Sequence, residues 1–148
     1  MEDIKGPEAP IKLYVCGFCF SPDLDLVALI KKNKPDWQID QLNGIGGKIE
    51  EGELPSQAMV REFREETGVT ILEDDWKDLG VLKNDEWQVF FYFAVSPQIP
   101  DKLESLTDEE VMAVHVKNLN NLPVIPNLRW LIPMALDPNH QFFEGYAK

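Results

Sequence analysis

One charged segment in the middle of the chain, residues 55–67, limits the fold more than any other part of the sequence. Pro55 stands where a helix would begin and Gly68 where it would end, since proline is favoured in the first turn and glycine just after the last. Met59 and Phe63 have the i, i+4 spacing that places apolar side chains on one helix face. The segment is therefore predicted to be a helix with Met59 at the centre of its buried face.

Three carboxylates share one side of this predicted helix. At about 100° per residue, Glu62, Glu65 and Glu66 fall within an arc of roughly 100°, and Glu66 projects only about 20° from Met59. Like charges this close destabilise a helix, the more so at a partly buried edge. Mg²⁺ removes that cost because it takes oxygen ligands and bridges carboxylates to substrate phosphates. We interpret the turn as a magnesium site, while the same residues also fit an ordinary salt-bridged helix in which Arg61 pairs with Glu65.

The residues on both sides of the helix favour the magnesium site. From Gly47 onward the chain fits the spacing G-x5-E-x7-R-E-U-x-E-E-x-G-U, where U is apolar, without a gap or mismatch. The specified positions are Gly47, Glu53, Arg61, Glu62, Phe63, Glu65, Glu66, Gly68 and Val69. So long a pattern rarely matches by chance, and it resembles the signature of the Nudix hydrolases. The resemblance implies an α+β fold, a Nudix-type α/β/α sandwich with a mixed central sheet against which the motif helix packs.

The resemblance also implies roles for individual residues. Nudix enzymes cleave a nucleoside diphosphate linked to another moiety, by attack of water on a phosphorus. The ligands of Mg²⁺, for which Mn²⁺ can substitute, would be Gly46 through its carbonyl, Glu62, Glu65, Glu66 and Glu110. The catalytic residues would be Glu62, Arg61 and Glu65, with Glu62 as the first choice of general base and Glu53 as support for the loop and helix. For the acidic residues 108–110, a solvated turn is the alternative.

Features outside this motif resemble the MutT-related branch that hydrolyses oxidised purine nucleoside triphosphates. They are residues 43–48, 126–133 and 143–146. In that branch the loop asparagine, here Asn43, contacts the base, and Lys48 and Asn127 are further predicted substrate contacts. Because Asn127 and Leu128 stand where those enzymes carry base-reading acids, the base is left open. Hydrolysis of a nucleoside triphosphate to monophosphate and pyrophosphate is the leading hypothesis. The alternatives are a pyrophosphatase for ADP-ribose or a nucleotide sugar, and a non-catalytic module that senses a nucleotide.

The charge of the chain excludes some partners. A formal net charge of −12 argues against binding to a nucleic-acid backbone and predicts that a phosphorylated substrate binds as a metal complex, helped by a few local cations. Lys31, Lys32 and Lys34 form the densest basic cluster, which fits either a solvated loop or contact with substrate phosphates. Trp37 nearby could cover a base or close the core. No apolar run approaches a membrane span, so a soluble, cytoplasmic protein without a membrane partner is expected.

The rest of the chain reads as one domain. We expect a flexible arm over residues 1–10 and a single domain over 11–148, without internal repeats. Strands are predicted over residues 11–20, 24–31, 69–72, 76–82, 87–95 and 111–116, the first two as a hairpin. A second helix is predicted over 126–136, where Pro133 implies a kink or a late start. Cys16 and Cys19 should face opposite sides of a strand as reduced thiols. The apolar content of Phe142 and Phe143 would permit a homodimer.

Overall fold

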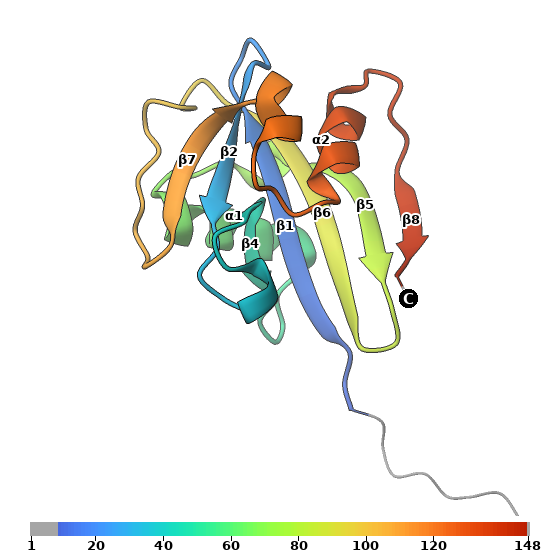
Figure 1. Ribbon diagram of the computed structural model, residues 1–148. Coiled ribbons are helices and arrows are strands. Elements are labelled where there is room, and N and C mark those ends of the chain that lie inside the picture. Colours follow the sequence, from blue (N-terminus) through green and yellow to red (C-terminus); the bar gives the residue numbers. More distant parts are fainter. Residues whose placement is uncertain (1–8, 148) are drawn as a thin grey trace, which may run out of the picture.

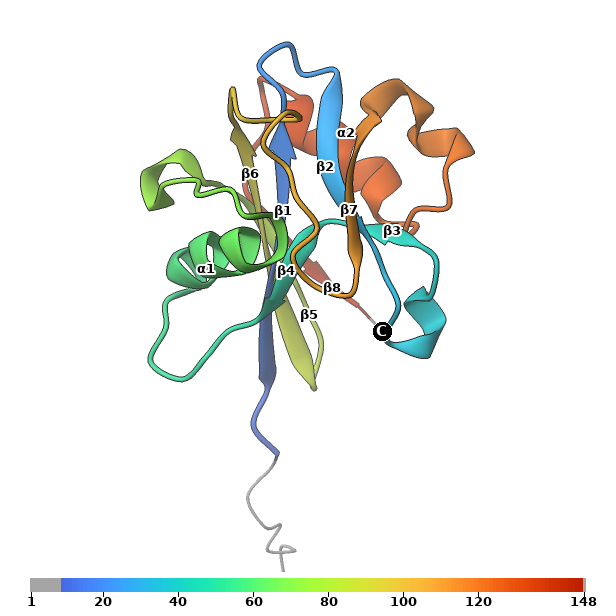
Figure 2. The same cartoon turned by 90° about the vertical axis from the view of Figure 1, so that its left-hand side faces the viewer.

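The chain folds as a mixed β-sheet between two helices (Figure 1). The computed structural model describes residues 9–147. The strands are β1 (Lys12–Phe20), β2 (Leu26–Lys31), β3 (Leu42–Asn43), β4 (Ile45–Lys48), β5 (Lys77–Lys83), β6 (Trp87–Val95), β7 (Glu110–His115) and β8 (Phe143–Tyr146). The helices α1 (Pro55–Thr67) and α2 (Leu128–Leu136) lie on opposite sides of the sheet in Figure 2. The predicted α+β class and sandwich architecture are confirmed.

Two long strands form the centre of the sheet. β1 and β6 run parallel over their whole length, from the pair Lys12 and Trp87 to the pair Phe20 and Val95. The sheet order is β3-β2-β1-β6-β5-β8, with β4 paired to β1 and β7 paired to β2. β1 is antiparallel to both β2 and β4, which confirms the predicted hairpin and makes the sheet mixed. The predicted bounds of the strand over 87–95 match β6.

The sheet separates two hydrophobic clusters, because successive side chains of a strand point to opposite faces. Cys19 lies in the cluster under α1, together with the fully buried Met59 and Phe63. Cys16 lies in the cluster under α2, which contains Leu131. Both cysteines are buried free thiols, so their predicted placement on opposite faces is confirmed.

The bounds of α1 are those expected from the sequence. Gly68 ends the helix in the left-handed conformation, with φ of 77°, and its N–H donates to the Arg64 carbonyl at 2.9 Å. At the other end, the Gln57 side chain accepts the N–H of Leu54 at 3.0 Å, which satisfies one backbone donor at the helix start. The acidic residues of this helix therefore lie on a rigid element.

The sequence-based assignments differ from the structure at three elements, and the short strands β3 and β4 were not predicted either. Residues 69–72 form no strand, because the Val69 N–H donates to the Thr67 hydroxyl at 3.1 Å while the Val69 side chain covers the core from a loop. The second helix starts at Leu128, two residues after the predicted start, which is the late start that Pro133 within it indicated. The short edge strand β8 was missed because its few residues carry little periodicity.

The C-terminal phenylalanines have different environments. Phe143 packs edge-on against Trp130, with ring centroids 5.8 Å apart, and its ring lies over Gly80, where a Cβ would come within 2.1 Å of it. Phe142 is exposed. The apolar surface that suggested a homodimer is therefore smaller than the sequence implied.

Residues 1–8 of the predicted arm lie outside the described residues. Over the described range 9–147, no helix has both the length and the apolar character needed to cross a membrane.

Candidate active site

The side chain of Glu62 lies directly over the backbone of β4. A Cβ built on Gly47 would lie 2.6 Å from the Glu62 carboxyl carbon, so only glycine leaves room for this carboxylate. Gly46 beside it faces β1, where a Cβ would fall 1.9 Å from the Val15 carbonyl oxygen. The two glycines of the predicted loop therefore allow α1, β1 and β4 to approach closely at the predicted metal site.

Arg61 ties α1 to the loop that follows β4. Its Nε and Nη2 donate to the two carboxylate oxygens of Glu53 at 2.7 and 2.9 Å, and Nη2 also donates to the Lys48 carbonyl at 3.0 Å. Its Nη1 donates to Glu62 at 2.9 Å and to Glu65 at 3.2 Å. Arg61 therefore contacts both Glu53 and Glu62, and its contacts include the Arg61–Glu65 pair of the alternative interpretation. The supporting roles of Arg61 and Glu53 stay predictions.

Glu66 is held from the other side by the loop before β7. The Thr107 hydroxyl donates to the Glu66 carboxylate at 2.9 Å, and the N–H of Leu106 donates to the Glu66 carbonyl at 3.2 Å. Burial raises the pKa of Glu66, although the Thr107 hydrogen bond and the charge of Lys32 oppose the shift. A carboxylate that is costly to ionise in this way is stabilised by a cation.

Like Glu66, Glu62 is costly to ionise. Burial raises the pKa of Glu62, and the neighbouring charges of Glu65 and Glu66 add to the shift, against the opposing hydrogen bond from Arg61. The side chain of Glu62 is 12% exposed and that of Glu65 is 52% exposed. Of the two acids, only Glu62 thus lies in a largely desolvated position.

The oxygen donors fit a hard divalent cation. Within residues 9–147 no three acidic, histidine or cysteine side chains are gathered around one point. Glu62 and Glu65 accept hydrogen bonds from Arg61, and Glu66 accepts one from Thr107. The available donors are nevertheless the carboxylate oxygens of α1 and the backbone carbonyl oxygens of the two glycines. Burial makes ionisation of Glu62 and Glu66 costly, and a cation would offset that cost. Mg²⁺ suits such a set because it binds one or two carboxylates and keeps several waters.

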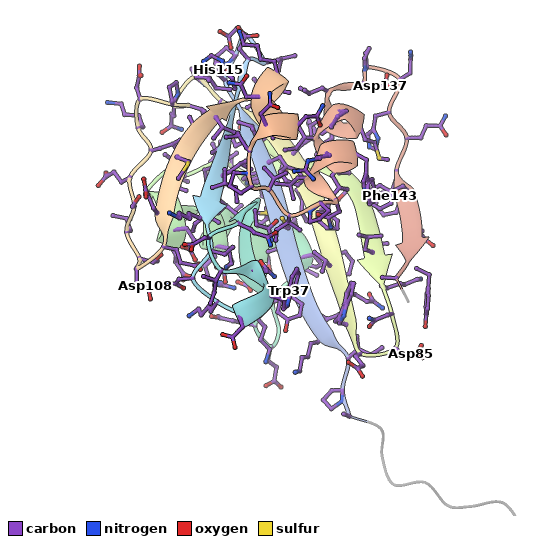
Figure 3. The ribbon with its side chains drawn as sticks, in the orientation of Figure 1. Trp37, Asp85, Asp108, His115, Asp137 and Phe143 are labelled. Atoms are coloured by element: carbon purple, nitrogen blue, oxygen red, sulfur yellow. The ribbon has the colours of Figure 1, made fainter. Side chains whose placement is uncertain are left out.

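The acidic residues 108–110 differ in burial in a way that the sequence did not reveal. Glu110 is exposed and opposite Lys31 in the β2–β7 ladder, whereas Glu109 is 5% exposed and its charge reaches Glu66. In Figure 3 Asp108 marks the end of the loop that leads into β7. Strand register decides which of two adjacent acids points inward, so Glu109 could not be chosen from the sequence. A metal-ligand role for Glu110 stays a prediction.

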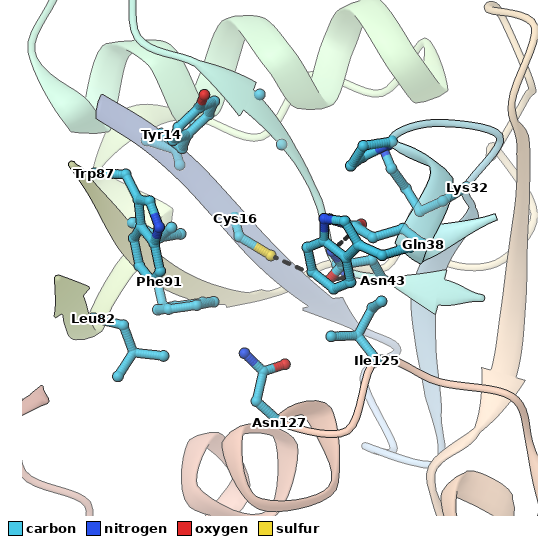
Figure 4. Close-up of a pocket in the computed structure, with 17 residues that line it drawn as sticks. Tyr14, Cys16, Lys32, Gln38, Asn43, Leu82, Trp87, Phe91, Ile125 and Asn127 are labelled. Atoms are coloured by element: carbon cyan, nitrogen blue, oxygen red, sulfur yellow. Dashed lines mark hydrogen bonds between the residues drawn. The ribbon is translucent and has the colours of Figure 1, made fainter. Parts of the chain in front are cut away.

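A cavity of about 490 Å³ lies on the α2 side of the sheet (Figure 4). Its apolar surface comes from β1, β5, β6 and the segment before α2, including Cys16, Leu82, Phe91 and Ile125. Gly46 and Gly47 also line it. Because Gly47 contacts Glu62 as well, one strand, β4, joins the cavity to the acidic helix.

Neutral amides supply most of the polar groups of the cavity. Asn43 accepts the Gly44 N–H at 2.8 Å through Oδ1 and donates to Gln38 Oε1 at 3.1 Å through Nδ2. Asn127 projects from the start of α2 (Figure 4), and its buried Oδ1 has no hydrogen-bond partner among the described residues. A buried acceptor without a partner is expected where a ligand donates.

The structure brings two of the three predicted substrate contacts together. Asn43 and Asn127 line the same cavity. Lys48 is exposed and outside its lining, and uses its carbonyl to bind Arg61. Sequence reasoning missed Gln38 as a cavity residue. The sequence left two roles open for Trp37, covering a base or closing the core. Trp37 lines the cavity and is 65% exposed, so it does not close the core.

The chain resembles known proteins in sequence and in fold. The chain is 32% identical over 110 residues to the uncharacterised Nudix hydrolase YvcI of Bacillus subtilis, a match that spans 69% of this chain and 66%, just under two thirds, of that relative. A MutT structure from a comparison of the Aliivibrio salmonicida and Vibrio cholerae proteins aligns with a TM-score of 0.70 at 23% identity, over 84% of this chain and 98% of that one.

Two further solved structures share the fold. The Nudix domain of Shewanella oneidensis NrtR complexed with ADP ribose aligns with a TM-score of 0.68 at 21% identity, over 90% of this chain and 91% of that one. A bifunctional NMN adenylyltransferase/ADP ribose pyrophosphatase of Francisella tularensis, complexed with AMP and a Mn ion, aligns at 0.70 and 18% identity, over 88% of this chain and 42% of that one. The NUDIX domain family matches residues 12–134, which is most of the chain. The chain therefore belongs to the Nudix family and has a MutT-like fold.

Proposed function

We propose that this protein is a Mg²⁺-dependent hydrolase that cleaves a nucleoside triphosphate to monophosphate and pyrophosphate. The observation that carries the proposal is the shared position of Gly47, which lines the cavity and contacts Glu62. A base held in the cavity would place its phosphate chain along β4, towards the carboxylates of α1. The metal, Mg²⁺ or Mn²⁺, would be held by Glu62, Glu65, Glu66 and the Gly46 carbonyl.

The residues of α1 have different proposed roles in the reaction. When bound, Mg²⁺ neutralises phosphate charge and makes a coordinated water easier to deprotonate. Glu62 is the proposed general base, because burial raises its pKa and so makes it a better proton acceptor. Arg61 keeps the Glu62 carboxylate in place through its hydrogen bond of 2.9 Å. Positioning of water and phosphate, rather than covalent catalysis, then accounts for most of the rate.

The cavity supports a nucleoside as the bound group. Aromatic residues and neutral amides line it, a combination that stacks on a base and hydrogen-bonds to its edge. Asn127 offers an acceptor and the amide pair of Asn43 and Gln38 offers further groups. We infer that these amides select which base binds, oxidised or not. A site built to hydrogen-bond one group of a substrate discriminates strongly against analogues that lack that group.

Hydrolysis of ADP-ribose or a nucleotide sugar is the second candidate. It is favoured by the fold shared with the NrtR Nudix domain complexed with ADP ribose and with the Francisella tularensis bifunctional enzyme. A non-catalytic nucleotide sensor is the third candidate. Its weakness is that all three α1 carboxylates of the motif are present.

Turnover of a substrate panel with product identification tests these candidates. The panel holds the common and 8-oxo nucleoside triphosphates, ADP-ribose and a dinucleoside polyphosphate, each with and without Mg²⁺. Monophosphate plus pyrophosphate from a triphosphate supports the proposal. Cleavage only of ADP-ribose or the dinucleotide replaces the substrate class, and nucleotide binding without turnover favours the sensor.

Glu62→Gln provides the site-specific arm of that experiment. The variant should lose most turnover and keep the fold, because glutamine retains the shape and removes the proton acceptor and the anionic ligand. Glu51→Gln, in the exposed turn before α1, is the matched control and should retain wild-type turnover. Equal turnover by Glu62→Gln and Glu51→Gln would show that the site assignment is wrong.

A further inference from the structure

A continuous chain of polar contacts connects α1 to a lysine in the cavity wall. The Thr107 hydroxyl donates to Glu66 at 2.9 Å and accepts the N–H of Glu109 at 3.3 Å. The Glu109 carboxylate in turn accepts a hydrogen bond from the Lys32 ammonium at 3.0 Å. The loop before β7 thus contacts both the acidic helix and the cavity.

Both oxygens of the Glu109 carboxylate are used. Oε1 binds Lys32, and Oε2 accepts the backbone N–H of Asn33 at 2.7 Å. The side chains of Glu109 and Lys32 are 5% and 20% exposed, so the pair is largely removed from water. A buried ion pair is weak evidence for stability, because desolvation offsets the attraction, but two fixed oxygens hold the ammonium in one place.

Lys32 is the cation best placed to meet a phosphate. Over residues 9–147 it is the only charged side chain that lines the cavity. The neighbouring Lys31 and Lys34 are exposed, and Lys31 lies 3.9 Å from Asp40. An ammonium carries three donors, and one bond to Glu109 leaves the others for a ligand. In a chain of net charge −12, a polyanion entering the cavity needs such a local cation.

We propose that Glu109 is a positioning residue, which fixes Lys32 at the cavity wall as the cation that binds the phosphate chain of the nucleotide. The inference rests on the proposed function for the identity of the ligand. It assigns Glu109 a role through Lys32 and no role in proton transfer or metal binding. Removing Lys32 should therefore make a change at Glu109 silent, because the residue that Glu109 positions is gone.

The test compares Lys32→Gln, Glu109→Gln and the double variant, with Lys31→Gln as a matched control on the exposed neighbour. The substrate that the panel identifies gives KM and kcat. Calorimetry with inorganic tripolyphosphate and Mg²⁺ gives phosphate affinity without chemistry, and the parent nucleoside gives base affinity. Lys32→Arg keeps the charge and is the conservative rescue.

The expected result is a change in binding rather than in the chemical step. Lys32→Gln and Glu109→Gln should each raise KM and the Kd of tripolyphosphate about tenfold, the effect of losing one charge-assisted contact, with kcat within about threefold. The double variant should match Lys32→Gln alone, and the Kd of the nucleoside should not change. If Lys32→Gln does not fold, the comparison of Glu109→Gln with Lys32→Arg and Lys31→Gln still applies, because glutamine can accept the Asn33 N–H.

Two results would overturn the positioning role. The first is a large loss of kcat in Glu109→Gln with KM unchanged, which would assign Glu109 to the chemistry. The second is a double variant weakened by the product of the two single effects, which would show that Glu109 acts independently of Lys32.

Failure of the proposed function gives a different pattern. Wild-type protein would then cleave no triphosphate. The Kd of tripolyphosphate alone would then decide whether Glu109 positions Lys32. Binding that both single variants weaken alike supports the positioning role. Binding that they leave unchanged, or no binding by the wild type, refutes it.

Discussion

Replacement of Arg61 by methionine tests how strongly the loop after β4 is held to α1. Methionine reproduces the aliphatic part of the arginine side chain but has no hydrogen-bond donor, so the variant removes every contact of the guanidinium at once. Those contacts are the paired bonds to Glu53 at 2.7 and 2.9 Å, the bond to Glu62 at 2.9 Å and the bond to the Lys48 carbonyl at 3.0 Å. The more exposed partners Glu65, at 3.2 Å, and Glu50, at 3.7 Å, are lost as well. Two largely buried carboxylates then lose their cation.

The expected cost follows from the exposure of the partners. The side chains of Arg61, Glu53 and Glu62 are 16%, 15% and 12% exposed. Removing one partner of a buried pair costs about 3–5 kcal/mol, and an exposed pair contributes about 0–1 kcal/mol. Residual access to water places the variant at the low end of the buried range, at about 3 kcal/mol. For a chain of this length that loss lowers Tm by about 6–12 °C.

Urea unfolding followed by tryptophan fluorescence measures this loss. Arg64→Met is the matched control, because Arg64 is on the same helix, is exposed and makes no ion pair within residues 9–147. The control should lie within about 0.5 kcal/mol of wild type. If Arg61→Met unfolds at the same urea concentration as Arg64→Met, the reasoning from burial is refuted. Adding Glu53→Gln to Arg61→Met should restore part of the loss, since the unpaired carboxylate is then absent.

Three further predictions use other parts of the structure. Gly46→Ala should prevent stable folding, because the new methyl meets a backbone carbonyl. Gly47→Ala places its methyl against the carboxylate of Glu62, which can move, so it should lower turnover more than tenfold with only a small change in Tm. Equal Tm values for the two variants would contradict this. Burial raises the pKa of the Cys16 and Cys19 thiols to about 12, so little thiolate forms below that pH and both should resist iodoacetamide at pH 8 until urea unfolds the chain, as mass spectrometry will show. The same shift means that stability present below the usual thiol pKa is lost as pH rises through about 12, and an alkaline unfolding titration measures it. Thr107→Val should lower kcat several-fold with KM nearly unchanged, because the carboxylate that it orients belongs to α1; a change in KM alone would contradict that role.

The sequence predicted the acidic helix closely because its signals are local. The bounds of α1, its buried residues and the common side of its three carboxylates follow from one helical period and from Pro55 and Gly68. The long strand β6 was equally clear from its aromatic and β-branched residues. The missed strand β8 depends instead on a parallel partner far away in the chain, β5, and has no local pattern of its own.

The sequence by itself therefore determined the chemistry-bearing helix, the glycines that precede it and the family to which the chain belongs. Only the tertiary structure decided which residues lie close together: Glu109 rather than Glu110 near Glu66, Lys32 and Gln38 in the cavity, and Lys48 outside it. The cavity is built from β1, β4, β5, β6 and the segment before α2, whose relative positions depend on strand register and packing. A register shift of one residue reverses which side chains face the cavity, and no local period in the sequence specifies that shift.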